Sequence, residues 1–308
     1  MGQSMKRSAF AAALFALTGA LFYGCGGSSG GGASGSSDTQ SSWDWTIEEG
    51  VRMPDITSSC TLLLPDNTYR TYTPGIRTAT SSDGLTWSSL SPVNGLNAGP
   101  GEFFSNPSVI RLADGTFMMI YEKDANNVRS LYRAVSSDGI TFTPSSSGAV
   151  MYPGSGDNNF LSVPDMVFIN GTTIRMYFVA GGDFIDSATS SDNGMTWTRE
   201  GRITIPGVNT SQQLDPDIVA IEGGYRLFFA TPPPGVDFDN MRIWSATSTD
   251  GRNFTLEAGE RVGVDNASQL RLDPDVVLTP EGFYRMYFGE ATSAVANDFS
   301  IHSAVSGG

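Results

Sequence analysis

Histidine is almost absent from this 308-residue sequence, in which His302 is the only one. A Ser-His-Asp triad needs an imidazole as its base, and zinc sites commonly draw on several histidines. A single histidine therefore nearly excludes a His-based triad and a multi-histidine metal site. The sequence also lacks a glycine-rich phosphate-binding loop that follows a strand and opens a helix.

Positive charge is scarce as well. The chain has 18 Lys and Arg against 32 Asp and Glu, which gives a formal net charge of -14. Nucleic-acid binding requires a basic face for the phosphates, so this balance argues against DNA or RNA as a partner. Stretches with helical periodicity are missing after residue 40, whereas β-branched and aromatic runs, glycine and proline are abundant. This profile predicts an all-β domain.

A long apolar run occurs once, at the N-terminus. The run AFAAALFALTGALFYG follows Lys6 and Arg7, and Cys25 comes directly after it. This arrangement resembles a bacterial lipoprotein signal, which predicts a cleaved signal peptide over residues 1–24 and a lipid on the Cys25 thiol. The alternative is an ordinary cleaved signal or an uncleaved anchor. A lipoprotein signal implies an extracytoplasmic protein of the cell envelope or cell surface, in contact with the membrane through its lipid only.

Residues 25–42 combine this cysteine with a Gly/Ser-rich segment typical of a flexible tether. Such a tether has an r.m.s. reach of roughly 20–25 Å, enough to hold a domain away from a membrane. Cys60 is the second and last cysteine. With Cys25 lipidated, no intrachain disulfide is available.

The rest of the chain, residues 43–308, repeats itself. Glycines of one turn motif recur at intervals of 55, 55 and 57 residues, at Gly84, Gly139, Gly194 and Gly251. A hairpin-like block precedes each turn, as in VPDMVFINGTTIRMYF and DPDVVLTPEGFYRMYF, and SSCTLLLPDNTYRTYT supplies a fifth copy. Two hairpins per repeat make four antiparallel strands, which is the pattern of a propeller blade. The sequence predicts a five-bladed β-propeller.

The last repeat, IHSAVSGG, stops at its turn without a fourth strand. The N-terminal stretch WDWTIEEGVR at residues 43–52 is similar to the fourth strands MTWTREGRI and NFTLEAGERV of earlier repeats. We therefore expect this stretch to pair with the strand that ends at Ser306 and to complete the last blade. Such closure leaves no open sheet edge between the first and last blades.

The turn motif itself resembles the Asp-box of sialidases, and residues 190–197 match it in full. In that family the box is a turn at the blade periphery. The Asp accepts backbone N–H bonds, the Gly permits positive φ, and the aromatic residue packs between sheets. We interpret the box as structural, and five blades are one too few for a sialidase.

Aspartates near the start of each hairpin also have a structural interpretation. Counted from the turns, they face arginines across the hairpin, which predicts three cross-strand ion pairs: Asp165–Arg175, Asp217–Arg226 and Asp275–Arg285. In the first repeat the same count places Arg70 opposite Cys60, so Arg70 is left to find another partner. If the carboxylates are not paired in this way, Asp165 and its equivalents are candidate ligands.

The residue just before the proline position of each hairpin varies: Ser58, Asn106, Val163, Asp215 and Asp273. The first strand of a propeller blade lines the central axis, so we call these five the axial residues. Variation inside a regular repeat is typical of a binding site placed on a scaffold. Asp215 and Asp273 could hold sugar hydroxyls, coordinate a hard cation such as calcium in the axial channel, or act as an acid/base pair. The alternative is a solvated acidic rim.

The repeats resemble the five-bladed enzymes of glycoside hydrolase family 43, the arabinanases and xylosidases. In that family an Asp-Pro-Ser-Ile motif carries the general base, and NPSVI at Asn106 stands in its place. VPDM at Val163 and LDPD at Leu214 match the second and third motifs, and LDPD at Leu272 stands where the family has its acid. Two departures matter: Asn106 cannot accept a proton from water, and Asp273 replaces a longer Glu.

The resemblance implies a carbohydrate-binding propeller, and its departures at Asn106 and Asp273 lead us to expect little or no turnover. We expect a monomer, without a cofactor apart from the calcium considered above. In the enzymatic alternative, an inverting glycoside hydrolase, Asp273 is the acid and Asp215 tunes its pKa. Glu102 and Asp55 are then spare carboxylates for the base. A further alternative is a non-catalytic protein-interaction propeller at the cell surface. The residues expected to contact a ligand besides the two acids are Asn106, Asp165, Arg70, Glu102 and Asp55.

Overall fold

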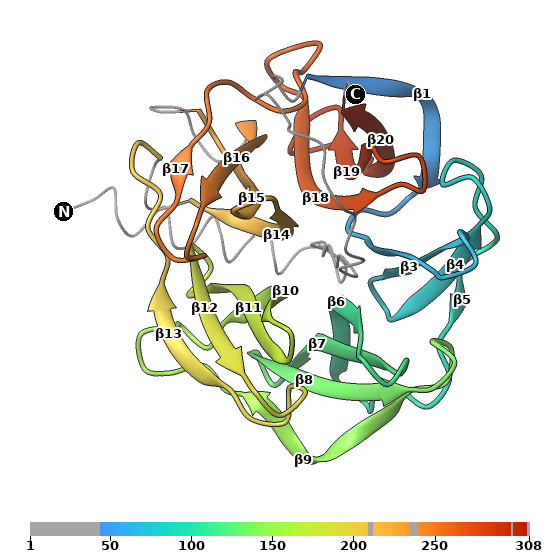
Figure 1. Cartoon of the computed structure of the whole chain (residues 1–308), viewed down its shortest axis with the longest axis vertical. Helices are drawn as coiled ribbons and strands as arrows, with labels where there is room; N and C mark the ends of the chain where they lie inside the picture. Colours follow the sequence, from blue (N-terminus) through green and yellow to red (C-terminus); the bar gives the residue numbers. More distant parts are fainter. Residues whose placement is uncertain (1–43, 209–211, 234–239, 297, 307–308) are drawn as a thin grey trace.

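The computed structural model describes residues 44–208, 212–233, 240–296 and 298–306. Its five sheets of four antiparallel strands each surround one axis, so the predicted all-β, five-bladed propeller is confirmed (Figure 1). Blades are numbered by their first strands in chain order. In the described ranges no helix is long and apolar enough to cross a membrane.

Within each blade the strands follow one another from the axis outward. Blade 1 contains β2 (Cys60–Leu63), β3 (Tyr69–Thr73), β4 (Arg77–Ser81) and β5 (Ser91–Pro92). Blade 2 contains β6 (Glu102–Arg111), β7 (Phe117–Ala125), β8 (Val128–Ser136) and β9 (Thr143–Met151). Blade 3 contains β10 (Leu161–Asn170), β11 (Thr173–Ala180), β12 (Phe184–Ser190) and β13 (Thr198–Arg202). Blade 4 contains β14 (Leu214–Ile221), β15 (Gly224–Thr231), β16 (Arg242–Ser248) and β17 (Thr255–Leu256). Blade 5 contains β18 (Leu270–Leu278), β19 (Tyr284–Ala291), β20 (Ser300–Ser306) and β1 (Trp45–Pro54).

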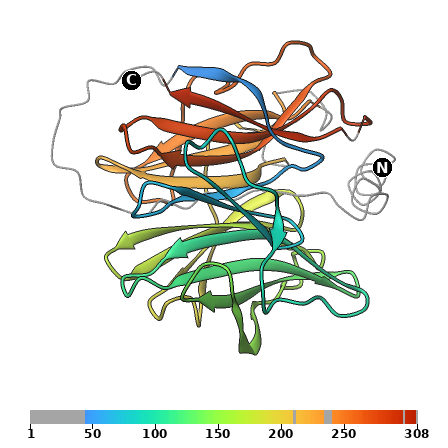
Figure 2. The same ribbon diagram turned by 90° about the vertical axis from the view of Figure 1, so that its right-hand side faces the viewer.

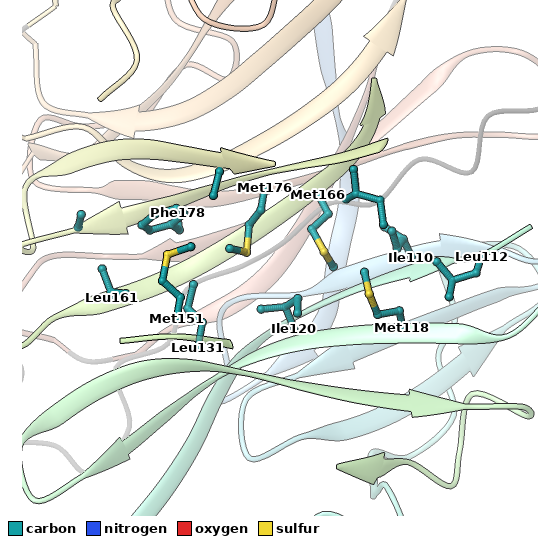
Figure 3. Packing of buried hydrophobic residues seen from close by; sticks show 13 residues of the cluster. Ile110, Leu112, Met118, Ile120, Leu131, Met151, Leu161, Met166, Met176 and Phe178 are labelled. Atoms are coloured by element: carbon teal, nitrogen blue, oxygen red, sulfur yellow. The ribbon is translucent and has the colours of Figure 1, made fainter. Parts of the chain in front are cut away.

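The hydrophobic core lies between neighbouring blades. Figure 3 shows one such interface, where Met118 and Ile120 of blade 2 face Met166 and Met176 of blade 3. All four side chains are fully or almost fully buried. Methionine suits this place because its flexible thioether fills the irregular gap between two twisted sheets.

The ring is closed by the two ends of the chain, as predicted. β1 pairs with β20 in an antiparallel register that joins Trp45 to Ser306 and Met53 to Ile301, with an irregularity between Glu48 and Met53. Figure 2 shows β1, in blue, beside the red strands of the same sheet. The last blade therefore takes its outermost strand from the beginning of the domain.

The Asp-boxes are peripheral and structural, as expected. In the fully matching box the Ser190 hydroxyl donates to Asp192 at 2.7 Å, and Asp192 accepts the Thr196 N–H at 2.9 Å. Three boxes also receive a tyrosine from the preceding blade. The hydroxyls donate to box carbonyls at 2.7–2.8 Å in the pairs Tyr72–Gly139, Tyr177–Gly251 and Tyr287–Gly84. The boxes therefore hold blades together far from the axis.

The predicted Asp–Arg pairs across the hairpins are wrong. Asp165 faces Tyr177, and Arg175 faces Val167, two residues further along the strand. The arginines instead bind glutamates of the fourth strands at 2.9 Å, in the pairs Arg175–Glu200, Arg226–Glu257 and Arg285–Glu48. A hydroxyl of the third strand completes each group, from Ser187, Ser245 and Ser303.

The blades that lack these groups support the corrected pairing. Blade 2 has Met118 at the arginine position and Ser145 at the glutamate position, so both partners are missing together. Blade 1 keeps Arg70 but has Leu90 at the glutamate position. Arg70 faces Leu62 rather than Cys60, and its Nε is buried without a hydrogen-bond partner in the part of the chain that the structure describes. Arg70 has lost its glutamate.

Candidate functional site

The five axial residues share one backbone conformation. Each has a positive φ, from 46° to 64°, and each is at most 1% exposed. In blades 2 to 5 the strand register breaks across this residue, which marks a β-bulge. Positive φ is costly for a residue with a side chain, and most costly for a β-branched one such as Val163. Because even Val163 adopts it, the bulge belongs to the fold, and the chemistry depends on which side chain each blade carries there.

A second relationship recurs around the axis. The axial residue of one blade meets the residue that precedes the axial residue of the next blade. The Thr57 hydroxyl of blade 1 donates to Asp273 of blade 5. Asn106 of blade 2 donates to Ser162 of blade 3 at 3.0 Å. Polar contacts between neighbouring blades therefore fix two of the five axial side chains.

For Asp215 the corresponding residue of the next blade, just before the axial Asp273, is apolar: it is Leu272. Leu272 belongs to a buried apolar cluster that also contains Leu214 and Val163. Both carboxylate oxygens of Asp215 are buried without a hydrogen-bond partner of normal geometry among the described residues. Burial raises the pKa of Asp215 well above its ordinary value, although the backbone N–H and the carboxyl of Asp273 lower it in part. The protonated form of Asp215 is therefore favoured.

Asp215 and Asp273 form one pair rather than two separate groups. The pKa of Asp215 responds to the Asp273 side chain as to a hydrogen-bond partner, so the two carboxyls lie close together. An inverting glycosidase needs its proton donor and its base about 6.5–9.5 Å apart, with water between them. Asp215 and Asp273 are too close for those two roles. A protonated carboxyl beside one that accepts the Thr57 hydroxyl suits hydrogen bonding to hydroxyl groups, as donor and as acceptor.

Two residues beyond each axial residue, a second ring of side chains clasps neighbouring blades. In four blades this side chain accepts a backbone N–H of a neighbouring inner strand, whereas Ser108 of blade 2 donates its hydroxyl to Asp165 at 3.4 Å. The distances are 3.2 Å from Val109 to Cys60, 2.6 Å from Ile218 to Asp165, 3.2 Å from Val276 to Asp217 and 3.0 Å from Thr61 to Asp275. Asp165 thus has a structural role between blades 3 and 4, and no ion pair with Arg175.

Three residues of this second ring, Asp165, Asp217 and Asp275, are fully buried acids, and we call them the clasp aspartates. Burial raises the pKa of Asp275 to about 6. Burial also raises the pKa of Asp217 well above its ordinary value, and the charges of Asp165 and Asp275 raise it further. Sequence reasoning placed these residues on the inner strands correctly, but it assigned them the wrong partners.

On the opposite side of the ring, Asn106 belongs to a network that the sequence did not reveal. The Asn106 amide donates to Glu122 at 2.7 Å, and the Ser162 hydroxyl also donates to Glu122. Glu122 binds Arg129 at 3.2 Å. Burial raises the pKa of Glu122, and the Arg129 charge opposes that shift. A comparison of the repeats at this strand position would have been the signal, because the other blades carry no charge there.

The remaining predicted ligands have partners or positions of their own. Glu102, at the start of β6, binds Lys123 at 2.6 Å and accepts the Gly99 N–H at 3.0 Å. Asp55 directly follows β1 and is exposed. Within residues 44–208, 212–233, 240–296 and 298–306, no three His, Cys, Asp or Glu side chains gather as a metal-binding group. The described site therefore offers no support for a calcium ion. Cys25, the signal peptide and the tether lie outside the described residues.

No protein-family model matches the sequence, and no curated protein matches it. Solved structures do match. A thermostable family-43 glycoside hydrolase superposes with a TM-score of 0.64 at 15% identity, over 84% of this chain and 92% of that chain. The fold is that of the family-43 glycoside hydrolases.

Two further solved structures superpose on this chain to a similar extent. An endo-1,4-beta-xylanase from Bacteroides thetaiotaomicron gives a TM-score of 0.63 at 14% identity, over 84% of this chain and 92% of that one. A family-43 endo-arabinanase from Bacillus licheniformis gives 0.60 at 18% identity, over 85% and 95%. At such low identity the likeness establishes the family-43 fold alone, and the site has to be argued from its own residues.

Proposed function

We propose that this protein binds carbohydrate at the axis of the propeller through Asp215 and Asp273, with little or no hydrolysis. The observation that carries the proposal is the buried pair itself. Asp215 has no good partner within the described chain, and Asp273 is held beside it by Thr57. A buried polar group without a partner costs free energy, and a ligand hydroxyl would satisfy it. The glycosidases and arabinanases of the same fold support carbohydrate as the ligand class.

Two features of the axis argue for binding without turnover. Asn106 stands where the family resemblance puts the general base, and a carboxamide cannot take a proton from water. The Asp273 carboxyl acts on the pKa of Asp215 as a hydrogen-bond partner does, so this pair does not leave the space for water that inversion requires. The side chains that remain can hold hydroxyl groups, but they do not make an acid and a base on opposite sides of a sugar.

An inverting glycoside hydrolase is the second candidate, and one observation favours it. The raised pKa of Asp215 is the property expected of a general acid at neutral pH. In this alternative Asp215, rather than Asp273, holds the proton, and Glu102 or Asp55 would have to approach the sugar from the other side as the base.

The binding experiment uses the purified protein with arabinan, xylan and fructan in affinity gels and calorimetry. We expect glycan retention that Asp215→Asn and Asp273→Asn weaken, with no release of reducing ends above background. Asp192→Asn, in a peripheral box, is the matched control and should bind as the original protein does. Robust hydrolysis abolished by Asp215→Asn would establish the enzyme instead. A complete lack of glycan binding would leave the protein-interaction propeller.

The proposal also includes a location outside the cytoplasm, with the propeller as a monomer on a lipid anchor. It rests on the N-terminal signal and the Gly/Ser-rich segment alone. Mass spectrometry of the protein purified from membranes should show Cys25 as the modified N-terminal residue. A soluble mature protein that begins elsewhere, without lipid, would contradict the anchor.

A further inference from the structure

A row of aromatic side chains crosses blade 2 from its inner strand to its outermost one. The ring centroid of Phe104 on β6 lies 5.2 Å from that of Tyr121 on β7, and Tyr121 lies 6.0 Å from Tyr132 on β8. Tyr152 directly follows β9. Burial raises the pKa of Tyr132, and the Tyr152 hydroxyl raises it further through its charge and as a hydrogen-bond partner, so these two side chains lie close together. We call these four residues the aromatic row of blade 2.

The aromatic row lies at the end of the propeller that carries the axial residues. Phe104 precedes the axial Asn106 by two residues on the same strand. Blade 2 is long at this end, because β6 begins at Glu102, four residues before its axial residue. In the neighbouring blade 1, β2 begins only at Cys60, two residues after the axial Ser58. The sheet of blade 2 therefore extends beyond the sheet of blade 1 beside the axis.

Most of the aromatic row is accessible and held in place. Tyr152 is 62% exposed, Phe104 and Tyr132 are partly exposed, and only Tyr121 is buried. The ammonium group of Lys123 lies 5.8 Å from the ring centroid of Phe104 and 5.2 Å from that of Tyr132. Such cation–π contacts fix the two rings relative to each other. A ligand that stacks on rings already in position does not have to order them.

The polar groups beside the rings have hydrogen-bonding capacity left. Lys123 binds Glu102 at 2.6 Å, and the two side chains are 19% and 30% exposed. An ammonium group has three donors and a carboxylate has two acceptor oxygens with several lone pairs, so this ion pair can also bind hydroxyl groups. A sugar ring has an apolar C–H face and polar edges. Aromatic faces with polar groups at their side match both parts of a sugar ring.

We propose that the aromatic row, with Lys123 and Glu102, binds the part of a glycan chain that extends outward from the axis, so that the ligand is a polysaccharide rather than a single sugar. This inference rests on the function proposed above, because continuity with the axial site favours glycan as the occupant. Neighbouring strands lie about 4.8 Å apart, so the row from β6 to β9 spans about 14 Å, which is longer than one sugar ring. A protein or a membrane would need a broad apolar surface, whereas this row is one side chain wide and contains an ion pair.

The experiment is calorimetry on the purified full protein with arabino-, xylo- and fructo-oligosaccharides, from the disaccharide to the octasaccharide of each series. We expect affinity to rise with chain length in the series that binds. Tyr152→Ala should raise the Kd of the octasaccharide about fivefold or more and leave the Kd of the disaccharide unchanged, because only a long chain reaches Tyr152. Tyr152→Phe keeps the ring, so it should restore most of the affinity. Both variants should keep the original melting temperature, since the side chain is exposed.

Phe103→Ala is the matched control. Phe103 is 50% exposed, but side chains alternate along a strand, so it lies on the opposite face of β6 from Phe104. Its loss should leave the Kd of every probe unchanged. Tight octasaccharide binding in Tyr152→Ala, or affinity independent of chain length, would overturn the inference and leave the proposed function intact. Length-dependent binding that Tyr152→Ala weakens and Asp215→Asn does not would support the row and contradict the axial site. If the original protein binds no probe, the proposed function fails and this inference fails with it.

Discussion

Glu48 and Arg285 lie 237 residues apart in the sequence, and their side chains meet at 2.9 Å in the last blade. The pair has internal counterparts in Arg175–Glu200 and Arg226–Glu257, where both partners come from one continuous blade. The N-terminal strand therefore contributes the same chemical group that ordinary fourth strands contribute. The closure of the ring is a specific pairing of side chains as well as a backbone pairing.

Breaking this group should destabilise the closure. Glu48→Gln removes the charge that compensates a largely buried guanidinium, and we expect a loss of about 1–3 kcal/mol in the free energy of unfolding. Urea denaturation monitored by tryptophan fluorescence measures it. Glu200→Gln breaks the same group inside blade 3. We expect the two variants to lose similar stability. Glu48→Gln should aggregate more than Glu200→Gln, because of these two glutamates only Glu48 holds a strand that protects a sheet edge. Equal aggregation in both variants would contradict this role.

The clasp aspartates predict an unusual pH dependence of stability. Asp275 has a pKa of about 6 in the folded protein, and the pKa of Asp217 is raised well above its ordinary value. The unfolded chain loses these protons near pH 4. Between about pH 4 and 6 the folded state thus binds more protons than the unfolded state, so this contribution to stability falls as pH rises. The melting temperature of Asp217→Asn should therefore decrease less between pH 5 and pH 8 than the melting temperature of the original protein.

The peripheral box aspartates provide the comparison. Hydrogen bonds from the backbone hold the pKa of Asp83 and Asp138 at about 2. Their contribution is present above pH 4 and is lost only as pH falls toward 2. Asp138→Asn should therefore leave the change between pH 5 and pH 8 as it is in the original protein. An unchanged slope in Asp217→Asn would argue that the clasp carboxyls do not titrate in this range.

A methyl group at the box turn of blade 4 should loosen its contact with blade 3. In Gly251→Ala the new Cβ would lie 2.4 Å from a nitrogen of Arg175 and 2.7 Å from the Tyr177 hydroxyl, at a φ of 71°. Gly223→Ala has a similar φ of 77° but open space around the Cβ. We expect about 1 kcal/mol of destabilisation for Gly223→Ala from the backbone alone and clearly more for Gly251→Ala. Thermal unfolding of the two variants measures the difference. Equal decreases in stability would show that the contact of Gly251 with blade 3 does not contribute to stability.

The buried pair of Asp215 and Asp273 should lower the stability of the folded protein. Asp215→Val places at this position the side chain that blade 3 tolerates in the same backbone conformation at Val163. It removes a buried carboxyl whose two oxygens have no hydrogen-bond partner of normal geometry and replaces it with an apolar side chain. We expect a higher melting temperature together with lost glycan retention, as for other binding sites that trade stability for function. A destabilised variant would mean that Asp215 serves the fold.

The order of residues along the chain was enough to determine the repeat, the number of blades, the structural use of the Asp-box and the exchange of the N-terminal strand into the last blade. These features depend on local patterns, which are spaced turn glycines, apolar strands and the similarity of WTIE to WTRE. Strand period and turn chemistry act over a few residues, so a single sequence displays them directly.

Only the tertiary structure decided which polar groups meet. The turn of each hairpin with a predicted Asp–Arg pair lies one residue later than the spacing suggested, between Asn170 and Thr173 in blade 3, so that Arg175 lies opposite Val167 and binds Glu200 instead of Asp165. Glu122 could not be connected with Asn106, because its contacts depend on the register of β7 and on Ser162 of the next blade. The apolar surroundings that raise the pKa of Asp215 likewise come from different blades. Repeats determine a scaffold through local interactions, whereas contacts between blades form only when the ring closes and buries them.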